Sequence, residues 1–130
     1  MLPQFQLERP VSITDVVGLL SEDALPYCGG TELLLAMKMG LLRPETLVDL
    51  KAVDELFGVR LDGPRVVIGA ATSHSEVSAS AVVREHLPLL AKVEDGVGNA
   101  RVRAQGSIGG NLCFAEPRSD ITTVLAALDA

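Results

Sequence analysis

Strand-like and helix-like segments alternate in the first fifty residues, and this order limits the fold more than any other feature of the sequence. Three apolar segments favour strands, at residues 5–10, 25–28 and 46–50. Two helices are expected between them, over residues 12–20 and 32–39. Successive strands that are joined by helical crossovers pair in parallel. The first part of the chain is therefore predicted to be a small parallel sheet of the α/β class.

The first predicted helix has a start signal and an apolar face. Ser12 can accept a hydrogen bond from an otherwise unpaired backbone N–H, and Asp15 places a carboxylate in the first turn, where the helix dipole favours negative charge. Gly40 is a stop for the second helix. Four apolar residues of the first helix recur at the spacing of one helix face: Ile13, Val16, Val17 and Leu20.

The pattern changes after residue 50. Residues 58–61 and 65–69 have the form of a β-hairpin, and Asp62-Gly63 between them supplies the positive φ angles that a hairpin turn needs. This change predicts two subdomains, residues 1–55 and residues 56–130.

The rest of the second subdomain is expected to be mainly helical. Residues 73–97 read as helical, and Pro88 is compatible with a helix only near its start. A connection rich in Gly and Arg is expected at residues 98–106, with a loop after it and a final helix at the end. Apolar stripes are formed by Leu90, Val93 and Val97, and in the last helix by Ile121, Val124, Leu125 and Leu128.

Composition excludes several classes of protein. Apolar residues make up 48% of the chain, although it has only three Phe, one Tyr and no Trp, so an aliphatic core is expected rather than disorder. The net charge of −6 and the absence of a Lys/Arg cluster argue against nucleic acid as a partner. We expect no membrane span and no secretory signal. Two cysteines form neither a disulfide framework nor a zinc motif, which favours the cytoplasm.

The residues with the clearest chemistry are two glycine pairs, in Cys28-Gly29-Gly30-Thr31-Glu32-Leu33 and in Ser107-Ile108-Gly109-Gly110-Asn111. Paired glycines permit unusual backbone angles and let a ligand approach the backbone N–H groups. A helix follows the first pair, so its unpaired N–H groups would face the same anion. The two segments together predict a site for a diphosphate that needs little Lys or Arg.

A simpler reading of each segment stays open. A Gly-Gly pair between a strand and a helix is often only a turn. Neither segment matches the dinucleotide pattern G-x-G-x-x-G or the phosphate loop that ends in Gly-Lys-Ser/Thr. The residues alone therefore predict an anion site and do not name the nucleotide.

Two motifs resemble those of a known family. Ser107-Ile-Gly-Gly-Asn-Leu followed by Ala115-Glu-Pro-Arg-Ser-Asp120 is similar to a signature of the FAD-binding domain of molybdopterin dehydrogenases, the family of xanthine and carbon monoxide dehydrogenases. Gly29-Gly-Thr-Glu-Leu33, with Met37-Lys38 and Arg43-Pro44 after it, resembles the other signature. The resemblance covers essentially the whole chain.

The resemblance implies a mixed α/β FAD-binding fold of the vanillyl-alcohol-oxidase and murein-reductase (PCMH) type, with two small subdomains and the second one incomplete. Asp120 would accept a hydrogen bond from the adenosine part of FAD, and Val97 would lie near the flavin ring. The FAD diphosphate would lie between the two glycine segments, in contact with Gly29, Gly30, Thr31, Glu32 and Leu33 on one side and with Ser107, Gly109, Gly110 and Asn111 on the other.

The implied function is electron transfer within a molybdenum hydroxylase. An iron–sulfur subunit and a molybdopterin subunit would be the partners, and FAD would pass electrons from [2Fe–2S] clusters to NAD+, oxygen or a quinone. Two alternatives are a non-catalytic remnant or assembly fragment without FAD, and a stand-alone flavin oxidase, for which 130 residues provide no substrate domain. Family members continue beyond the position of Ala130, so self-association, or a separate polypeptide that supplies the missing segment, is also expected.

Five further residues could contribute to a cofactor site or have only a structural role. His74 and His86 are both expected on the surface, although His74 could instead line the cofactor cleft. Cys113 is expected to be a small buried thiol, with a position facing the flavin or an iron–sulfur partner as the alternative. Arg101 and Arg103 either attract the anionic cofactor or are simply surface charges.

Overall fold

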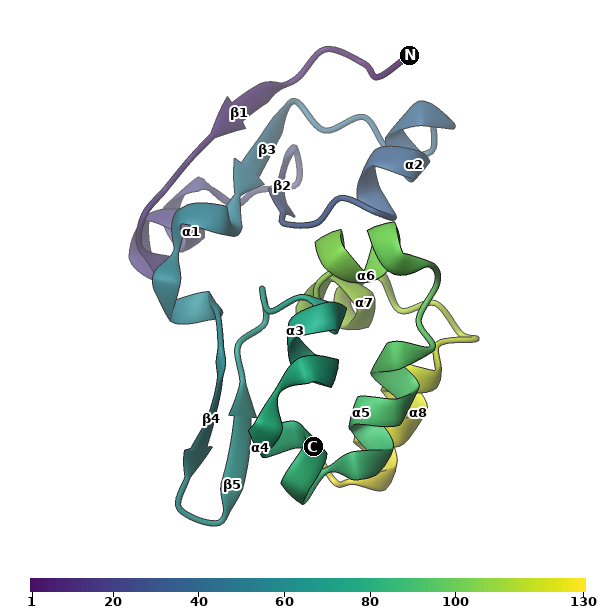
Figure 1. Cartoon of the computed structure of the whole chain (residues 1–130). Coiled ribbons are helices and arrows are strands. Elements are labelled where there is room, and N and C mark those ends of the chain that lie inside the picture. The colour runs from purple at the N-terminus through teal and green to yellow at the C-terminus, as the bar shows by residue number, and fades with distance from the viewer.

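A computed structural model describes residues 1–130 and shows a mixed α/β chain (Figure 1). The three expected strands form a parallel sheet in the order β1-β3-β2, with Leu47 of the central strand opposite both Leu7 and Leu25. The alternation of strands and helices is thus confirmed. The elements of this part are β1 (Gln6–Glu8), α1 (Ile13–Leu19), β2 (Ala24–Tyr27), α2 (Leu33–Lys38) and β3 (Thr46–Asp49).

Helix α1 begins as predicted, but fewer of its apolar side chains are buried than predicted. The Ser12 hydroxyl accepts a hydrogen bond from the Asp15 N–H, so the expected cap is confirmed. Of the predicted apolar face only Val16 is buried, and Val17 is 66% exposed. The strands are three or four residues long, so the sheet offers too little apolar surface to cover both turns of the helix.

The sheet has its own apolar cluster, in which the buried residues are Val16, Ala24, Val48 and Val53. Leu50 and Leu56 pack against this cluster from two 3₁₀ turns, at Leu50–Ala52 and Asp54–Leu56. These turns lead directly into the hairpin.

The β-hairpin is confirmed, but its turn lies one residue later than predicted. Strands β4 (Val59–Asp62) and β5 (Arg65–Ile68) are antiparallel, and Asp62 pairs with Arg65. The two turn residues are therefore Gly63 and Pro64. Only Gly63 has a positive φ, of 57°, because the proline ring keeps φ of Pro64 negative. A type II′ turn, with glycine at the first central position, meets both requirements.

Six helices follow: α3 (His74–Ala79), α4 (Ala81–His86), α5 (Pro88–Asp95), α6 (Ala100–Gln105), α7 (Ile108–Phe114) and α8 (Asp120–Ala127). Two predicted loops are wrong. The connection before residue 106 contains α6, which begins where the Asn99 side chain accepts hydrogen bonds from two backbone N–H groups. The second glycine pair lies in the first turn of α7, which Ser107 caps. In both places a capping side chain outweighs the low helix propensity of nearby glycine.

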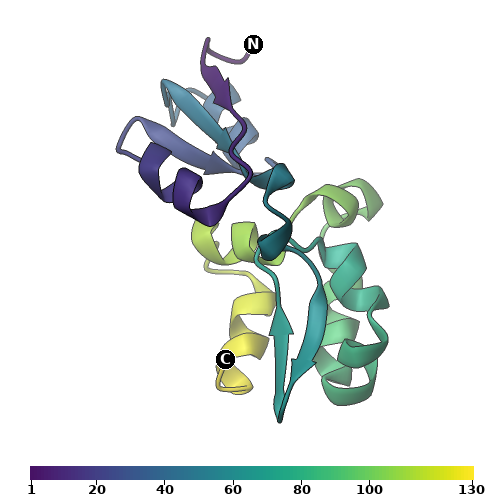
Figure 2. The same cartoon turned by 90° about the vertical axis from the view of Figure 1, so that its left-hand side faces the viewer.

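A second apolar cluster holds these helices together. Its buried residues are Val77, Val83, Leu90, Ala91, Ile108, Ile121 and Val124. On α8, Ile121 and Val124 are buried in this cluster, whereas Leu128 is 40% exposed. Figure 2 shows the hairpin with α8 on one side and α3, α4 and α5 on the other. No helix combines the length and the apolar character needed to cross a membrane.

Candidate functional site

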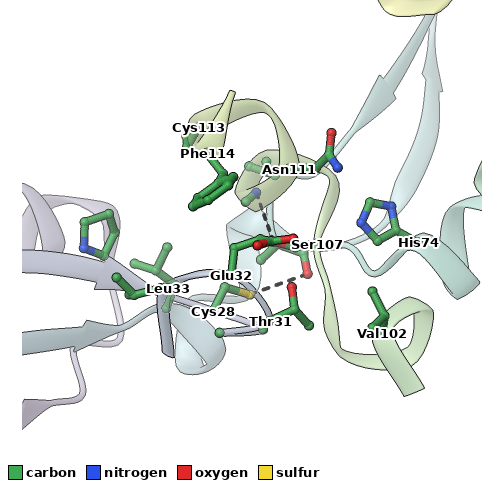
Figure 3. A pocket seen from close by; sticks show the side chains of 18 of the residues that line it. Cys28, Thr31, Glu32, Leu33, His74, Val102, Ser107, Asn111, Cys113 and Phe114 are labelled. Carbon is green, nitrogen blue, oxygen red and sulfur yellow. Dashed lines mark hydrogen bonds between the residues drawn. The ribbon is translucent and has the colours of Figure 1, made fainter. Parts of the chain in front are cut away.

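A cavity of about 360 Å³ lies where the parallel sheet meets the helical part of the chain. The segment that follows β2 forms one wall, at the carboxyl end of the sheet, where α/β proteins commonly bind ligands. The start of α7 forms the facing wall (Figure 3). Among the predicted site residues, the cavity is lined by Gly29, Gly30, Thr31, Glu32, Leu33, Ser107, Gly109, Gly110 and Asn111.

Asp120 does not line this cavity. It is exposed in the first turn of α8. Its neighbour Ser119, which the sequence did not single out, does reach the site, since its hydroxyl donates to Oδ1 of Asn111 at 2.7 Å. Just before it, Arg118 donates a hydrogen bond to Glu116 and thereby lowers the pKa of that carboxyl. The segment from Ala115 to Asp120 therefore orients Asn111 rather than forming the cavity wall.

The wall after β2 presents free backbone donors. Gly30 has φ of 69°, which turns the chain from the strand into α2. The N–H groups of residues 30–33 donate to no backbone or side-chain acceptor of the chain. Because unpaired amide groups seek acceptors, this wall is suited to an anionic or strongly polar ligand.

The facing wall differs, because its amide groups are already used. The N–H groups of Ile108 and Gly109 donate to carbonyls of Thr72 and Ala70, and that of Asn111 donates to the Ser107 carbonyl. The Gly110 N–H donates to the Ser107 hydroxyl at 3.1 Å, and Figure 3 shows this bond. What this wall offers a ligand is the Ser107 hydroxyl hydrogen and the side-chain amide of Asn111.

The four glycines are required for different reasons. A Cβ at Gly29 would collide with the carbonyl oxygen of Gln105 in α6, and one at Gly30 would lie 2.5 Å from the Tyr27 ring. A Cβ at Gly109 would lie 2.6 Å from the Ala70 carbonyl oxygen. At Gly110 the only atom within 4 Å would be the Ser107 hydroxyl oxygen, at 2.9 Å. Three glycines are therefore needed for packing within the chain, and only Gly110 is otherwise open.

Both cysteines are free and line the cavity. Cys28 is half-buried, with its Sγ 3.9 Å from the Ala71 carbonyl oxygen. Cys113 is exposed, so the expectation of a buried thiol is wrong. It follows Gly109 by four residues in α7, which puts both on the helix face that borders the cavity.

The expectation that His74 lies on the surface is also wrong, whereas His86 is exposed as predicted. His74 is only 2% exposed, lines the cavity, and places its Nδ1 2.5 Å from Oε2 of Glu94. Glu94 was missed from the sequence. Its burial could have been inferred from the sequence, because Glu94 follows Leu90 by four residues and precedes Val97 by three, and so lies on the predicted apolar stripe.

Charged side chains are scarce around the cavity. Glu32 is the only acidic residue in its lining, and no Lys or Arg contributes. Arg101 is exposed, and Arg103 donates to the carbonyls of Val97 and Gly98, which fixes the segment that brings Val97 to the wall. Neither arginine lines the cavity, so no contact there supports the alternative in which they attract the cofactor over the one in which they are surface charges.

The sequence matches known proteins along its whole length. Residues 3–130 match the family model described as the FAD binding domain in molybdopterin dehydrogenase. The chain is 36% identical to the carbon monoxide dehydrogenase medium chain of Hydrogenophaga pseudoflava over 131 residues, which are 98% of this chain and 46% of that one. It is 37% identical to the corresponding medium chain of Afipia carboxidovorans over 134 residues, 100% of this chain and 46% of that one. The chain thus spans about half the length of these relatives.

Solved structures agree with the sequence matches. Reconstituted CO dehydrogenase from Oligotropha carboxidovorans superposes with a TM-score of 0.90 at 37% identity, covering 93% of this chain and 43% of that one. Quinoline 2-oxidoreductase from Pseudomonas putida 86 superposes with a TM-score of 0.95 at 31% identity, covering 98% of this chain and 46% of that one.

A parallel sheet whose carboxyl end opens on a cavity between two glycine segments defines a protein that binds a nucleotide cofactor. The chain belongs to the family of FAD-binding domains of molybdopterin dehydrogenases, and its cofactor is FAD. Its fold is the PCMH-type FAD-binding fold that the two signatures implied.

Proposed function

We propose that this chain holds FAD between its two glycine segments as part of the electron-transfer subunit of a molybdenum hydroxylase. Electrons would pass from the [2Fe–2S] clusters of a partner subunit through FAD to NAD+, oxygen or a quinone, while a molybdopterin subunit oxidises the substrate. The partners are proposed because the similar medium chains belong to carbon monoxide dehydrogenases, and others to caffeine and nicotine-oxidising enzymes. We further propose that the protein acts in the cytoplasm, since both of its cysteines are free.

The single observation that carries the proposal is that the two walls of the cavity differ in the backbone N–H groups that they offer to a ligand. Residues 30–33 present unpaired amide groups, and Gly110 leaves open space opposite them. A diphosphate needs such donors and a close approach to the backbone. The remaining lining is largely apolar, as a planar ring system requires. The residues present therefore fit FAD.

Several of the predicted residues have proposed roles on this basis. Amide groups from Gly29 to Leu33 bind the diphosphate, and the Asn111 side chain, held by Ser119, binds it from the other wall. Val97 packs against the flavin ring. Asp120, which is exposed, contacts the adenosine end where the cofactor extends out of the cavity.

The bound FAD supplies the capacity to accept electrons from one-electron donors and to deliver them singly or in pairs. The protein positions it and limits the access of water. Residues 1–55 and 56–130 act as the two subdomains in this proposal. The packing of Leu50 and Leu56 with the sheet cluster supports a division within about one residue of this boundary, at the end of the second 3₁₀ turn.

Fluorescence titration of the purified chain with FAD tests the proposal. Flavin emission should be quenched with a saturating, one-to-one dependence, and free riboflavin should bind far more weakly because it lacks the diphosphate. Equal binding of FAD and riboflavin would place the nucleotide outside the glycine segments. Absence of any FAD binding would instead favour the alternative of a non-catalytic remnant.

A further inference from the structure

Lys51 lies behind the wall that follows β2 and contacts the start of the first glycine segment. Its Nζ donates a hydrogen bond to the Cys28 carbonyl oxygen at 3.5 Å and lies over the Tyr27 ring, 4.0 Å from the ring centre. It also forms an ion pair with Oδ1 of Asp49 at 3.2 Å. Tyr27 and Asp49 are the last residues of β2 and β3 and are paired across the sheet. One ammonium group therefore joins the ends of two strands to the glycine segment.

The position of the Lys51 side chain is fixed from the side of the sheet. Asp49 is buried, and its Oδ1 also accepts a hydrogen bond from the backbone N–H of Lys51, at 3.1 Å. Its other carboxylate oxygen lies 3.9 Å from Nε of Arg9. The Lys51 side chain is itself 50% exposed, and ion pairs of exposed side chains add little to stability. These contacts are therefore better suited to directing the ammonium group than to holding the fold together.

The Tyr27 ring transmits this constraint to the glycine segment. A Cβ at Gly30 would lie 2.5 Å from Cε2 of Tyr27, so the ring packs directly against the Gly30 backbone. The N–H groups of residues 30–33 form no hydrogen bond within the chain, so hydrogen bonds of their own do not fix their direction. The Tyr27 ring and the Cys28 carbonyl, both in contact with Lys51, supply two of the contacts that can fix it. Lys51 does not line the cavity, so it acts through this segment rather than on a ligand directly.

We propose that Lys51 is a positioning residue for the diphosphate of FAD, which holds the backbone N–H groups of residues 30–33 in the direction in which they bind the ligand. This inference rests on the proposed function, which puts the diphosphate at this segment. Donors that are fixed before binding lose less conformational freedom when the ligand arrives, so they bind it more tightly. Loss of the ammonium group therefore weakens the binding of ligands that carry the diphosphate. Binding of riboflavin is unaffected, because riboflavin has no diphosphate for these N–H groups to bind.

Titration of variants of the purified chain with three ligands tests the inference. Lys51→Met removes the ammonium group and keeps an unbranched side chain over the Tyr27 ring. The dissociation constants of FAD, from flavin fluorescence, and of ADP, from competition with FAD, should both rise about three- to tenfold, as expected for one exposed cation–π contact and one weak hydrogen bond. The riboflavin constant should stay within about twofold of its wild-type value. Lys51→Arg should restore most of the affinity, because the guanidinium keeps the charge and can stack on the ring.

A control and a second variant separate this role from a general effect on charge or folding. Lys92→Met removes the same charge from an exposed position of α5 outside the cavity, and it should bind all three ligands as the wild type does. Tyr27→Leu interrupts the same series of contacts one step closer to Gly30, and it should reproduce the selective loss of FAD and ADP affinity. In the ligand-free chain, the backbone amide NMR signals of residues 30–33 should shift in Lys51→Met and stay in place in Lys92→Met.

Two sets of outcomes distinguish the inference from the proposed function. Wild-type affinity for FAD and ADP in Lys51→Met or in Tyr27→Leu would overturn the inference and leave the proposed function standing. An equal loss of riboflavin affinity, or the same loss in Lys92→Met, would do so too. A wild-type chain that binds FAD and riboflavin equally, or binds no FAD, would overturn both.

Discussion

At the scale of single residues, Gly110 is the glycine of the two segments whose substitution should affect FAD binding more than folding. Its neighbours in the glycine segments already contact other parts of the chain, so substitutions at Gly29, Gly30 or Gly109 would disturb packing first. Gly110 is exposed, and only the Ser107 hydroxyl lies near its missing Cβ.

We predict that Gly110→Val lowers FAD affinity by at least about tenfold, equivalent to about 1.4 kcal/mol, because the branched side chain would occupy the approach to the cavity wall. The loss of the Ser107 cap should lower the free energy of unfolding by only about 1 kcal/mol. Flavin fluorescence and urea denaturation measure the two effects. Gly18→Val in α1, where no atom lies within 4 Å of the missing Cβ, is the control and should leave affinity unchanged. Wild-type affinity in Gly110→Val would move the cofactor away from α7.

At the scale of the elements, the hairpin turn shows how one residue redefines a local motif. Asp62-Gly63 matches a common turn pair, but Pro64 follows it, and proline has no backbone N–H to donate the hydrogen bond that would close a turn over these two residues. The turn therefore moves one position, and Asp62 becomes the last residue of β4.

We predict that Gly63→Ala destabilises the chain by about 1 kcal/mol, since alanine is disfavoured at φ of 57°. Asp62→Ala should change the free energy of unfolding by less than about 0.5 kcal/mol, because Asp62 is exposed and makes no side-chain hydrogen bond. Chemical denaturation of both variants checks this. A larger loss in Asp62→Ala than in Gly63→Ala would restore the turn that the sequence first indicated.

Local sequence patterns correctly predicted the elements whose signals lie within a few residues of one another. The Ser12 cap, the β-hairpin and the helix that begins at Pro88 all follow from short-range chemistry. The two glycine segments were found in the same way, and the cavity between them brings together every predicted site residue except Asp120. Such motifs can be recognised in the sequence because their structure depends mainly on the backbone of their own segment.

Contacts between distant residues could not be predicted in this way. The His74–Glu94 pair joins residues 20 positions apart on different helices, and nothing near His74 in the sequence identifies its partner. Glycine-rich residues 98–106 and 107–111 read as loops because glycine lowers helix propensity, whereas the capping contacts of Asn99 and Ser107 decide the outcome. The unequal use of amide groups on the two walls depends likewise on carbonyls of residues 70 and 72.

At the scale of the whole molecule, the sheet and the helical part are joined by a contact of backbone on backbone. Gly29, just after β2, lies against the carbonyl of Gln105 at the end of α6. Both segments border the cavity, so this contact sets how far apart its walls are.

We predict that Gly29→Ala lowers the free energy of unfolding by about 1–3 kcal/mol, because the added methyl group collides with a backbone carbonyl that cannot rotate away. Gly18→Ala, in an open position of helix α1, should leave the chain as stable or make it up to about 1 kcal/mol more stable. Urea denaturation of the two variants gives the comparison. Equal stability of Gly29→Ala and the wild type would mean that the two parts of the chain separate easily.

The contact between Gly29 and Gln105 also has a kinetic consequence. If the separation of the walls is already set in the folded chain, cofactor loading needs no closing motion of one part onto the other. In stopped-flow mixing, the rate of flavin quenching should then rise in proportion to FAD concentration without reaching a plateau, as for a single bimolecular step. A plateau would reveal a slow rearrangement before or after the encounter. The glycine at position 29 would in that sense determine how quickly the protein acquires its cofactor, as well as whether it folds.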